Sequence, residues 1–397
     1  MINAVLLATG ICFCQSAGTG QTSSAPTTTQ EQAKKGPLTA EEQHQQDLLN
    51  DVVLGRKYAA EVEKQIKVSK NAEFQARVQR IGAIVADIAN HNHIKALWGD
   101  TRFNTFEYHY KVLEGDDVNA FSLPGGFIYV YEGLMKFVES DDELAGVLGH
   151  ETSHAAFRHV ATLQSRASKM EAFELPMILM AILTHSAAGA AVLTGTQLSE
   201  TAITNGWSQQ AEQAADYGGF QILTKSHFNP TGMLTFMERL HAEEQKEPQI
   251  NWGIFTTHPP TRERADDVMA WLNEAGIPIQ RSRVTTSFRT ILKPGDKGDV
   301  EAWFADRMLY TFTGPNAETR AEQAAPRIDA FMDQVPEMFD VTTSNDGTIL
   351  GKGKPLFQVT QGDADAAGMK LPDAEQHAAS SVKRSLSILG YRIWDVH

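Results

Sequence analysis

The sequence predicts an α+β protein, in which a mainly helical domain with a small antiparallel sheet is followed by a smaller α+β domain. Apolar residues at helical spacing dominate residues 38–283. Three short strand-like runs are confined to residues 106–131, and the pattern changes after about residue 284. The 397 residues are enough for two such domains, which we place at 38–283 and 284–397.

The first 37 residues are expected to precede the folded part. Residues 4–13 form an apolar run of signal-peptide length, too short to span a bilayer, and small residues follow it, although no Lys or Arg precedes it. We therefore expect a signal peptide over residues 1–18 and export to the periplasm or cell envelope. Residues 19–37 are rich in Thr, Ser and Gln, which predicts a disordered linker.

The elements of the larger domain follow in order. Helical spacing predicts helices between Leu38 and Ile88, and the strands are expected at residues 106–112, 118–123 and 127–131. Ser140 with Glu143 three residues later predicts the start of a long helix. Further helices are expected at residues 208–224 and from Pro259 to Trp271. We interpret the apolar residues 172–194 as a buried helical hairpin rather than a membrane span, because flanking basic and aromatic residues are absent.

The smaller domain shows weaker patterns, and no internal repeat is evident. Alternation over residues 284–290 predicts a connecting strand. Helices are expected at residues 317–332 and 373–388, with short strands near Val341 and Phe357. We interpret Asp363 as part of a turn and helix cap rather than as a cation ligand.

The formal net charge of −14 argues against two classes of function. A general nucleic-acid binder needs a basic face, and docking on anionic lipid needs a polybasic patch. We therefore expect no nucleic-acid partner.

Residues 150–154 read His-Glu-Thr-Ser-His, the H-E-x-x-H pattern. On a helix, His150 and His154 lie one turn apart on one face, so both imidazoles can reach one metal ion. Glu151 lies beside them and can take a proton from a water molecule. The pattern alone is also compatible with a solvated helical face, but the predicted cap and apolar stripe place it on a real helix.

A catalytic zinc ion takes three protein ligands and keeps one position open. A ligand pattern with Gly at 157 and His at 160 is excluded, because Phe157 and Val160 stand there. His159 is one residue off, and we expect it to be a hydrogen-bonded structural histidine that points away from the metal face. The better third ligand is Glu212, with Asp216 one turn later to hydrogen-bond a ligand histidine.

Together these motifs resemble the zinc metalloprotease family of HtpX, the CAAX prenyl endopeptidases and BepA, most closely its soluble, exported BepA-like branch. Four ordered stretches carry the resemblance: residues 119–126, residues 149–159, the pair Glu212 and Asp216, and residues 257–264. The resemblance covers roughly residues 48–275 and implies a zincin-type (gluzincin) fold. The helical repeats that follow the peptidase domain in BepA are absent from the pattern of residues 284–397.

The resemblance also implies a role for each matching residue. His150, His154 and Glu212 would bind one zinc ion per chain, and Glu151 would act as general base. His258 would stabilise the oxyanion, and Arg262 would bind substrate or hold His258. The strand that begins with Asn119, Ala120 and Phe121 would be the edge along which an extended peptide lies.

The expected function is therefore that of a zinc-dependent endopeptidase acting on exported or envelope proteins in protein quality control. An alternative is a chaperone-like envelope assembly factor that retains the metallopeptidase fold, although a pure binder has no need of Glu151. A non-proteolytic zinc hydrolase is a third reading, which the peptide-binding edge strand disfavours. Peripheral membrane association and the oligomeric state stay open.

Overall fold

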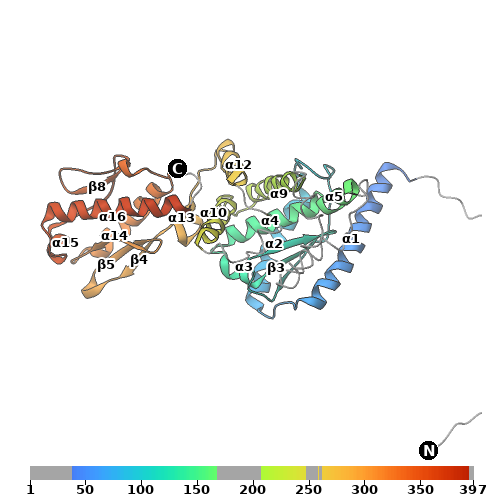
Figure 1. Cartoon of the computed structure of the whole chain (residues 1–397), viewed down its shortest axis with the longest axis horizontal. Helices are drawn as coiled ribbons and strands as arrows, with labels where there is room; N and C mark the ends of the chain where they lie inside the picture. Colours follow the sequence, from blue (N-terminus) through green and yellow to red (C-terminus); the bar gives the residue numbers. More distant parts are fainter. Residues whose placement is uncertain (1–37, 168–206, 247–257, 259–261, 393–397) are drawn as a thin grey trace, which may run out of the picture. The chain divides into compact units, whose positions relative to one another are not determined.

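The computed structural model describes residues 38–167, 207–246, 258 and 262–392 (Figure 1). The expected signal peptide, the linker and the hairpin at residues 172–194 lie outside these residues. Among the helices that are described, none is long and apolar enough to cross a membrane.

Helices predominate in the first part of the chain, as the sequence predicts. The helices that the structure describes up to residue 284 are α1 (Ala40–Gln65), α2 (Ala72–His91), α3 (Glu132–Phe137), α4 (Asp141–Ala156), α5 (His159–Ala167), α9 (Trp207–Thr224), α10 (Thr231–Lys246), α12 (Arg262–Glu274) and α13 (Arg281–Val284). The helical pattern of residues 38–88 breaks before α2, where the Asn71 side chain accepts a hydrogen bond from the Phe74 amide and caps the helix.

A three-stranded sheet lies among these helices, with the order β1-β3-β2. Its strands are β1 (His109–Leu113), β2 (Ala120–Leu123) and β3 (Phe127–Tyr131). The expected antiparallel pairing holds for β2 and β3, with Ala120 opposite Val130. By contrast, β1 runs parallel to β3, with His109 opposite Phe127. The sheet is therefore mixed, and β2 lies at its edge.

Both faces of this sheet are buried, and successive side chains of β3 point to opposite faces. Ile128 and Val130 belong to the apolar core that includes α2, α4 and α10. Tyr129 and Tyr131 belong to a second cluster, to which α1 contributes Ala59 and other residues. In Figure 1, α2 and α4 accordingly lie on one side of the sheet and α1 on the other.

Helices α4 and α9 cross at very short range, and glycine makes this approach feasible. A Cβ atom on Gly219 would lie 3.0 Å from the His150 amide nitrogen, and one on Gly218 would lie 2.4 Å from Ser153 Oγ. Side chains at these two positions would push the helices apart. The crossing holds the two segments that carry the predicted motifs against each other.

The last part of the chain has its own apolar core, which contains residues between Phe288 and Leu389. Its strands are β4 (Thr290–Pro294), β5 (Val300–Phe304), β6 (Arg307–Phe312), β7 (Val341–Thr343), β8 (Thr348–Gly351) and β9 (Lys354–Gln358). Its helices are α14 (Ala317–Met332), α15 (Gln361–Ala366) and α16 (Leu371–Arg392), with short 3-10 turns η1 (Thr286–Phe288), η2 (Asp296–Gly298) and η3 (Met338–Asp340). The connecting strand predicted at residues 284–290 is wrong, because α13 and η1 occupy that segment.

This part consists of two successive units built alike, although the sequence shows no evident repeat. Each unit has three consecutive antiparallel strands followed by a helical segment. In each, the second hairpin turns through a non-glycine residue at positive φ, Ala305 in the first and Lys352 in the second. Each second hairpin also contains a register shift. Asp363 caps α15 together with Thr360, as the sequence predicts.

Candidate metal centre

Helix α4 carries the H-E-x-x-H residues deep inside the molecule. The helix begins after Ser140, whose Oγ accepts a hydrogen bond from the Glu143 amide at 3.1 Å. One turn apart, His150 and His154 approach each other with 3.0 Å between their Nε2 atoms. Glu151 is 1% exposed, and its Oε2 has no hydrogen-bond partner among the described residues.

Helix α9 brings Glu212 and Asp216 to the same place. The two oxygens of Glu212 lie 3.3 Å from Nε2 of His154 and 3.4 Å from Nε2 of His150. Asp216 contacts the opposite edge of the His150 ring, with 2.8 Å between Oδ1 and Nδ1. Glu212 therefore faces the same side as the two Nε2 atoms, whereas Asp216 holds the back of one imidazole.

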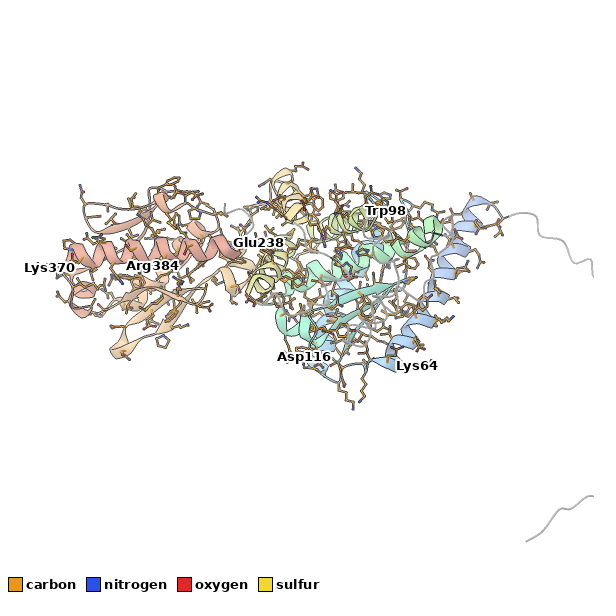
Figure 2. The ribbon with its side chains drawn as sticks, in the orientation of Figure 1. Lys64, Trp98, Asp116, Glu238, Lys370 and Arg384 are labelled. Carbon is orange, nitrogen blue, oxygen red and sulfur yellow. The ribbon has the colours of Figure 1, made fainter. Side chains whose placement is uncertain are left out.

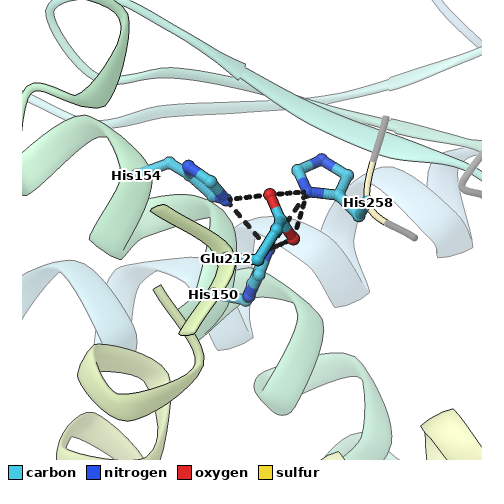
Figure 3. A group of neighbouring side chains, drawn as sticks. All are labelled: His150, His154, Glu212 and His258. Carbon is cyan, nitrogen blue, oxygen red and sulfur yellow. Dashed lines mark hydrogen bonds and ion pairs between the residues drawn. The ribbon is translucent and has the colours of Figure 1, made fainter. Parts of the chain in front are cut away.

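His258 completes the cluster in Figure 3. Its Nδ1 lies 3.2 Å from Nε2 of His150 and 3.0 Å from both oxygens of Glu212. The ligand-capable atoms of His150, His154, Glu212 and His258 all lie within 4.8 Å of one another. The Nε2 atom of His258 is 3.4 Å from Glu151 Oε1. The histidine that we expected over the site thus lies among the atoms that could bind a metal.

The donor atoms match a zinc ion in both number and spacing. Tetrahedral ligands about 2.0–2.1 Å from zinc lie roughly 3.3 Å apart. The separations among His150, His154 and Glu212 are 3.0–3.4 Å. Three of these donors leave one zinc position open, whereas four including His258 would close it.

The electrostatics of the cluster favour a cation. Burial disfavours the charged form of His150, yet its interactions with Asp216 and Glu212 raise its pKa to about 10. Burial likewise opposes ionisation of Glu212, but neighbouring His258 and Arg264 hold its pKa well below the usual value. The carboxylates of Glu212 and Asp216 therefore stabilise positive charge on the His150 side of the cluster, a charge that a bound metal ion could supply in place of the proton.

Arg264 is a residue of the site that the sequence reasoning missed. Its Nε and Nη2 lie 2.7 and 2.8 Å from the two oxygens of Asp216, and its Nη1 lies 3.1 Å from Glu212 Oε2. Arg262, which we expected to contact substrate or His258, has a side chain 41% exposed and lies 3.6 Å from Asp266. The available signal was helical spacing, since Arg264 falls in line with the buried residues Val268 and Leu272.

His159 also lies closer to the site than we expected. It is a hydrogen-bonded histidine outside the ligand cluster, as predicted, and it is only 2% exposed. However, its Nδ1 lies 2.8 Å from Nδ1 of His154, so the ring packs directly behind a candidate ligand. The prediction that it points away from the metal face missed this contact.

The expected peptide-binding residues lie on the edge strand β2 or, for Asn119, directly before it, and their side chains are buried. Asn119 and Ala120 are fully buried and Phe121 is 2% exposed. Only the backbone of this segment could therefore pair with a peptide. An apolar pocket lies beside the cluster, lined by His150, Glu151 and His258 and by the side chains of Val147, Met233, Phe236, Met237 and Leu240.

Comparison with known proteins places this centre in a family. Residues 75–272 match peptidase family M48, and residues 302–388 match a domain of unknown function, DUF8459. The chain is 31% identical to metalloprotease YcaL of Escherichia coli K12 over 199 residues. These residues cover 49% of this chain and 72% of YcaL. This chain therefore belongs to peptidase family M48.

In two further relatives, the region that matches this chain is only part of the relative's length. The beta-barrel assembly-enhancing protease of Escherichia coli K12 is 33% identical over 173 residues, which cover 42% of this chain and 35% of that protein. The mitochondrial metalloendopeptidase OMA1 of Schizosaccharomyces pombe is 30% identical over 193 residues, which cover 48% and 54% of the two chains. The chain thus spans about a third to a half of the length of these relatives.

Proposed function

We propose that this chain is a zinc-dependent endopeptidase of the zincin (gluzincin) type, with one zinc ion bound by His150, His154 and Glu212. The spacing of their donor atoms and the carboxylates that face the His150 ring support this ligand set. Asp216 would fix the His150 ring from behind, and membership of family M48 supports peptide-bond hydrolysis as the reaction.

The observation that carries the proposal is the state of Glu151. A buried carboxylate is costly unless it has partners, yet one of its oxygens has none among the described residues. Such an atom is free to accept a proton from a water molecule beside the cluster. Zinc, when bound there, supplies a Lewis acid and lowers the pKa of a coordinated water toward neutrality. Glu151 then takes the proton of the attacking water and returns it to the leaving amine.

We also propose that His258 donates a hydrogen bond to the oxyanion formed from the scissile carbonyl. In this structure its Nδ1 lies among the ligand atoms, so it has to withdraw before a carbonyl group can take that place. His258→Ala distinguishes an oxyanion donor from a mere obstruction. Turnover of a peptide substrate falls in the first case and rises in the second.

The proposed substrates are polypeptides bound in extended form along β2. The edge position of β2 supports strand addition, in which the peptide pairs with the backbone near Asn119, Ala120 and Phe121. Arg262 is retained as a proposed substrate contact, because its side chain is partly exposed at the start of α12. The apolar pocket would receive a side chain of the bound peptide.

We propose that the chain is exported and acts on envelope proteins in quality control. The apolar run at residues 4–13 supports export, and a relative named as a beta-barrel assembly-enhancing protease supports an envelope substrate. Mass spectrometry of envelope-extracted protein should find a mature N-terminus near residue 19–24. Recovery of intact Met1 from that fraction would contradict export by a cleaved signal.

The chaperone-like alternative is less well supported, because the relatives are named as proteases or metalloendopeptidases and Glu151 is intact. The decisive experiment is digestion of casein and of an envelope extract by the purified mature protein, with and without a chelator. We expect cleavage that the chelator stops and added zinc restores. Cleavage that is insensitive to the chelator, or no cleavage of either substrate, would contradict the proposal.

A further inference from the structure

The two candidate histidine ligands are held from behind by different kinds of partner. Nδ1 of His150 lies 2.8 Å from the carboxylate of Asp216, a carboxylate that Arg264 also binds. Nδ1 of His154 lies 2.8 Å from another imidazole, Nδ1 of His159. A ligand histidine needs its second nitrogen fixed, because that hydrogen bond sets the tautomer and the orientation of the ring.

The contacts of His159 determine which nitrogen carries each proton. Its Nε2 lies 3.2 Å from the Trp98 carbonyl oxygen, which can only accept a hydrogen bond. His159 therefore donates from Nε2, and in the neutral ring Nδ1 is left as an acceptor. Among the described residues, the donor that meets this acceptor is the Nδ1–H of His154. This leaves the lone pair of His154 on Nε2, the atom that faces Glu212 and His150.

The backbone is shaped to hold His159 in this place. Between α4 and α5 the chain turns through Arg158, a non-glycine residue at φ 51°, which brings the next side chain back over His154. The guanidinium of Arg158 bonds to Asp51 at 2.6 Å and to Asp100 at 3.1 Å, so two carboxylates stabilise the unusual turn.

The loop that supplies the acceptor is fixed against the same turn. The Asp100 amide donates to the Phe157 carbonyl at 2.7 Å. Gly99 has φ 98°, and a Cβ atom there would lie 2.7 Å from the His159 ring and 2.5 Å from the Phe157 carbonyl oxygen. Trp98, labelled in Figure 2, packs its ring 5.3 Å from that of His159. Only glycine fits at position 99, between the His159 ring and the Phe157 carbonyl. This close packing keeps the Trp98 carbonyl within hydrogen-bond distance of His159 Nε2.

We infer that His159 is a positioning residue, which fixes the tautomer and orientation of His154 by a hydrogen-bond relay from the Trp98 carbonyl through both imidazoles. The inference rests on the proposed zinc site but concerns a residue outside the ligand set. We expect the two hydrogen bonds of His159 to affect the affinity and the geometry with which the site binds a metal ion. Loss of such a partner typically lowers metal affinity by about 10- to 100-fold.

Matched variants of the full mature chain separate this role from simple packing. His159→Gln places its amide near the former Nε2 and leaves no acceptor at the Nδ1 position. His159→Asn places its carbonyl oxygen near the former Nδ1, so it can still accept from His154. His159→Leu fills the space without any acceptor. His91→Ala, at a side chain 73% exposed, is a control outside the site.

The measurements are zinc affinity by chelator competition and the visible absorption of the cobalt-substituted protein. We expect about 10- to 100-fold weaker zinc binding in His159→Gln and His159→Leu, a shifted cobalt spectrum, and substantial recovery of both in His159→Asn. The comparison of Gln with Asn carries the test even if the Leu variant does not fold.

Two results would overturn the inference. One is zinc affinity in His159→Gln within about twofold of the wild-type value. The other is an equal loss in the Gln and Asn variants that follows their thermal stability, which indicates packing alone. Failure of the zinc site itself looks different, because the wild-type chain would then bind no stoichiometric zinc or would keep it in His150→Ala.

Discussion

Two of the regions in which this chain buries carboxylates treat them differently. In the last part of the chain, Asp363 is 5% exposed and accepts hydrogen bonds from Thr313, Thr360 and Tyr310 while it pairs with Arg320. In the α4–α9 crossing, Glu151 is 1% exposed and has one oxygen without a hydrogen-bond partner among the described residues. The oxygens of Asp363 are thus occupied by structural hydrogen bonds, whereas Glu151 has an oxygen that can still accept a proton or a hydrogen bond.

The difference teaches how to separate structural from functional charge in this molecule. Satisfied buried carboxylates contribute to stability, and their loss should appear as unfolding. An incompletely satisfied carboxylate beside clustered imidazoles has a cost that the fold alone does not explain. Substitutions in the two regions should therefore separate loss of activity from loss of stability.

The largest effect is expected from Glu151→Gln. Glutamine has nearly the same size but cannot take the proton of the attacking water. General acid–base catalysis is worth about 10²- to 10⁴-fold, so turnover should fall by at least about two orders of magnitude while zinc content and melting temperature are retained. Initial rates on a fluorogenic peptide, paired with metal analysis, check this. Undiminished turnover, or full rescue of a deletion strain by this variant, would favour the chaperone-like alternative.

Asp216→Asn should produce the next largest effect. The amide keeps the shape of the carboxylate but removes the charge that holds both Nδ1 of His150 and Arg264. We expect zinc affinity to fall by about 10- to 100-fold, as measured by competition with a chelator. An affinity equal to that of the wild-type chain would show that Asp216 is a structural partner of Arg264 alone.

Asp363→Asn should lower the stability of the protein without affecting zinc binding or activity, the opposite of the two substitutions above. Removal of this charge leaves half-buried Arg320 without its counter-ion, so we expect the free energy of unfolding to fall by about 2 kcal/mol. Zinc affinity and peptidase turnover should stay at wild-type values. Urea denaturation and the same rate assay measure the two quantities, and a loss of zinc affinity in this variant would contradict the separation.

The smallest effect concerns pH. Burial raises the pKa of Asp329 to about 6, whereas an unfolded Asp has a pKa of about 3.9. The folded state therefore binds the proton more tightly, and stability falls as the pH rises from about 4 to 6. Asn keeps an acceptor for the Thr290 amide at 2.7 Å without ionising. A pKa difference of about two corresponds to at most about 2.7 kcal/mol, and partial exposure of Asp329 to solvent reduces it. Asp329→Asn should therefore raise the free energy of unfolding by about 1 kcal/mol at pH 7 and change it little at pH 4, by urea denaturation. An equal effect at both pH values would contradict this assignment.

Much of the fold could be predicted where local signals are strong. The capped start of α4 and the bounds of β3 and α14 agree with the sequence, because each depends on neighbouring residues. Strands β5 and β6 were not predicted. Their hairpin turns at Ala305 instead of at the Gly or Asn that usually marks such a turn.

The candidate site divides in the same way. The H-E-x-x-H pair depends on helix geometry alone, so the sequence predicts that both side chains share a face. The partners of His154 and Asp216 depend on tertiary contacts. His159 reaches His154 only because Arg158 takes a left-handed conformation, and Arg264 reaches Asp216 from a different helix.

The central claim is that His150, His154 and Glu212 form one zinc site. Metal analysis of the purified mature chain, after dialysis against metal-free buffer, tests it most directly. The account predicts about one zinc ion per wild-type chain and almost none in a folded His150→Ala variant. A wild-type chain without stoichiometric zinc, or a His150→Ala chain that retains it, would contradict the account.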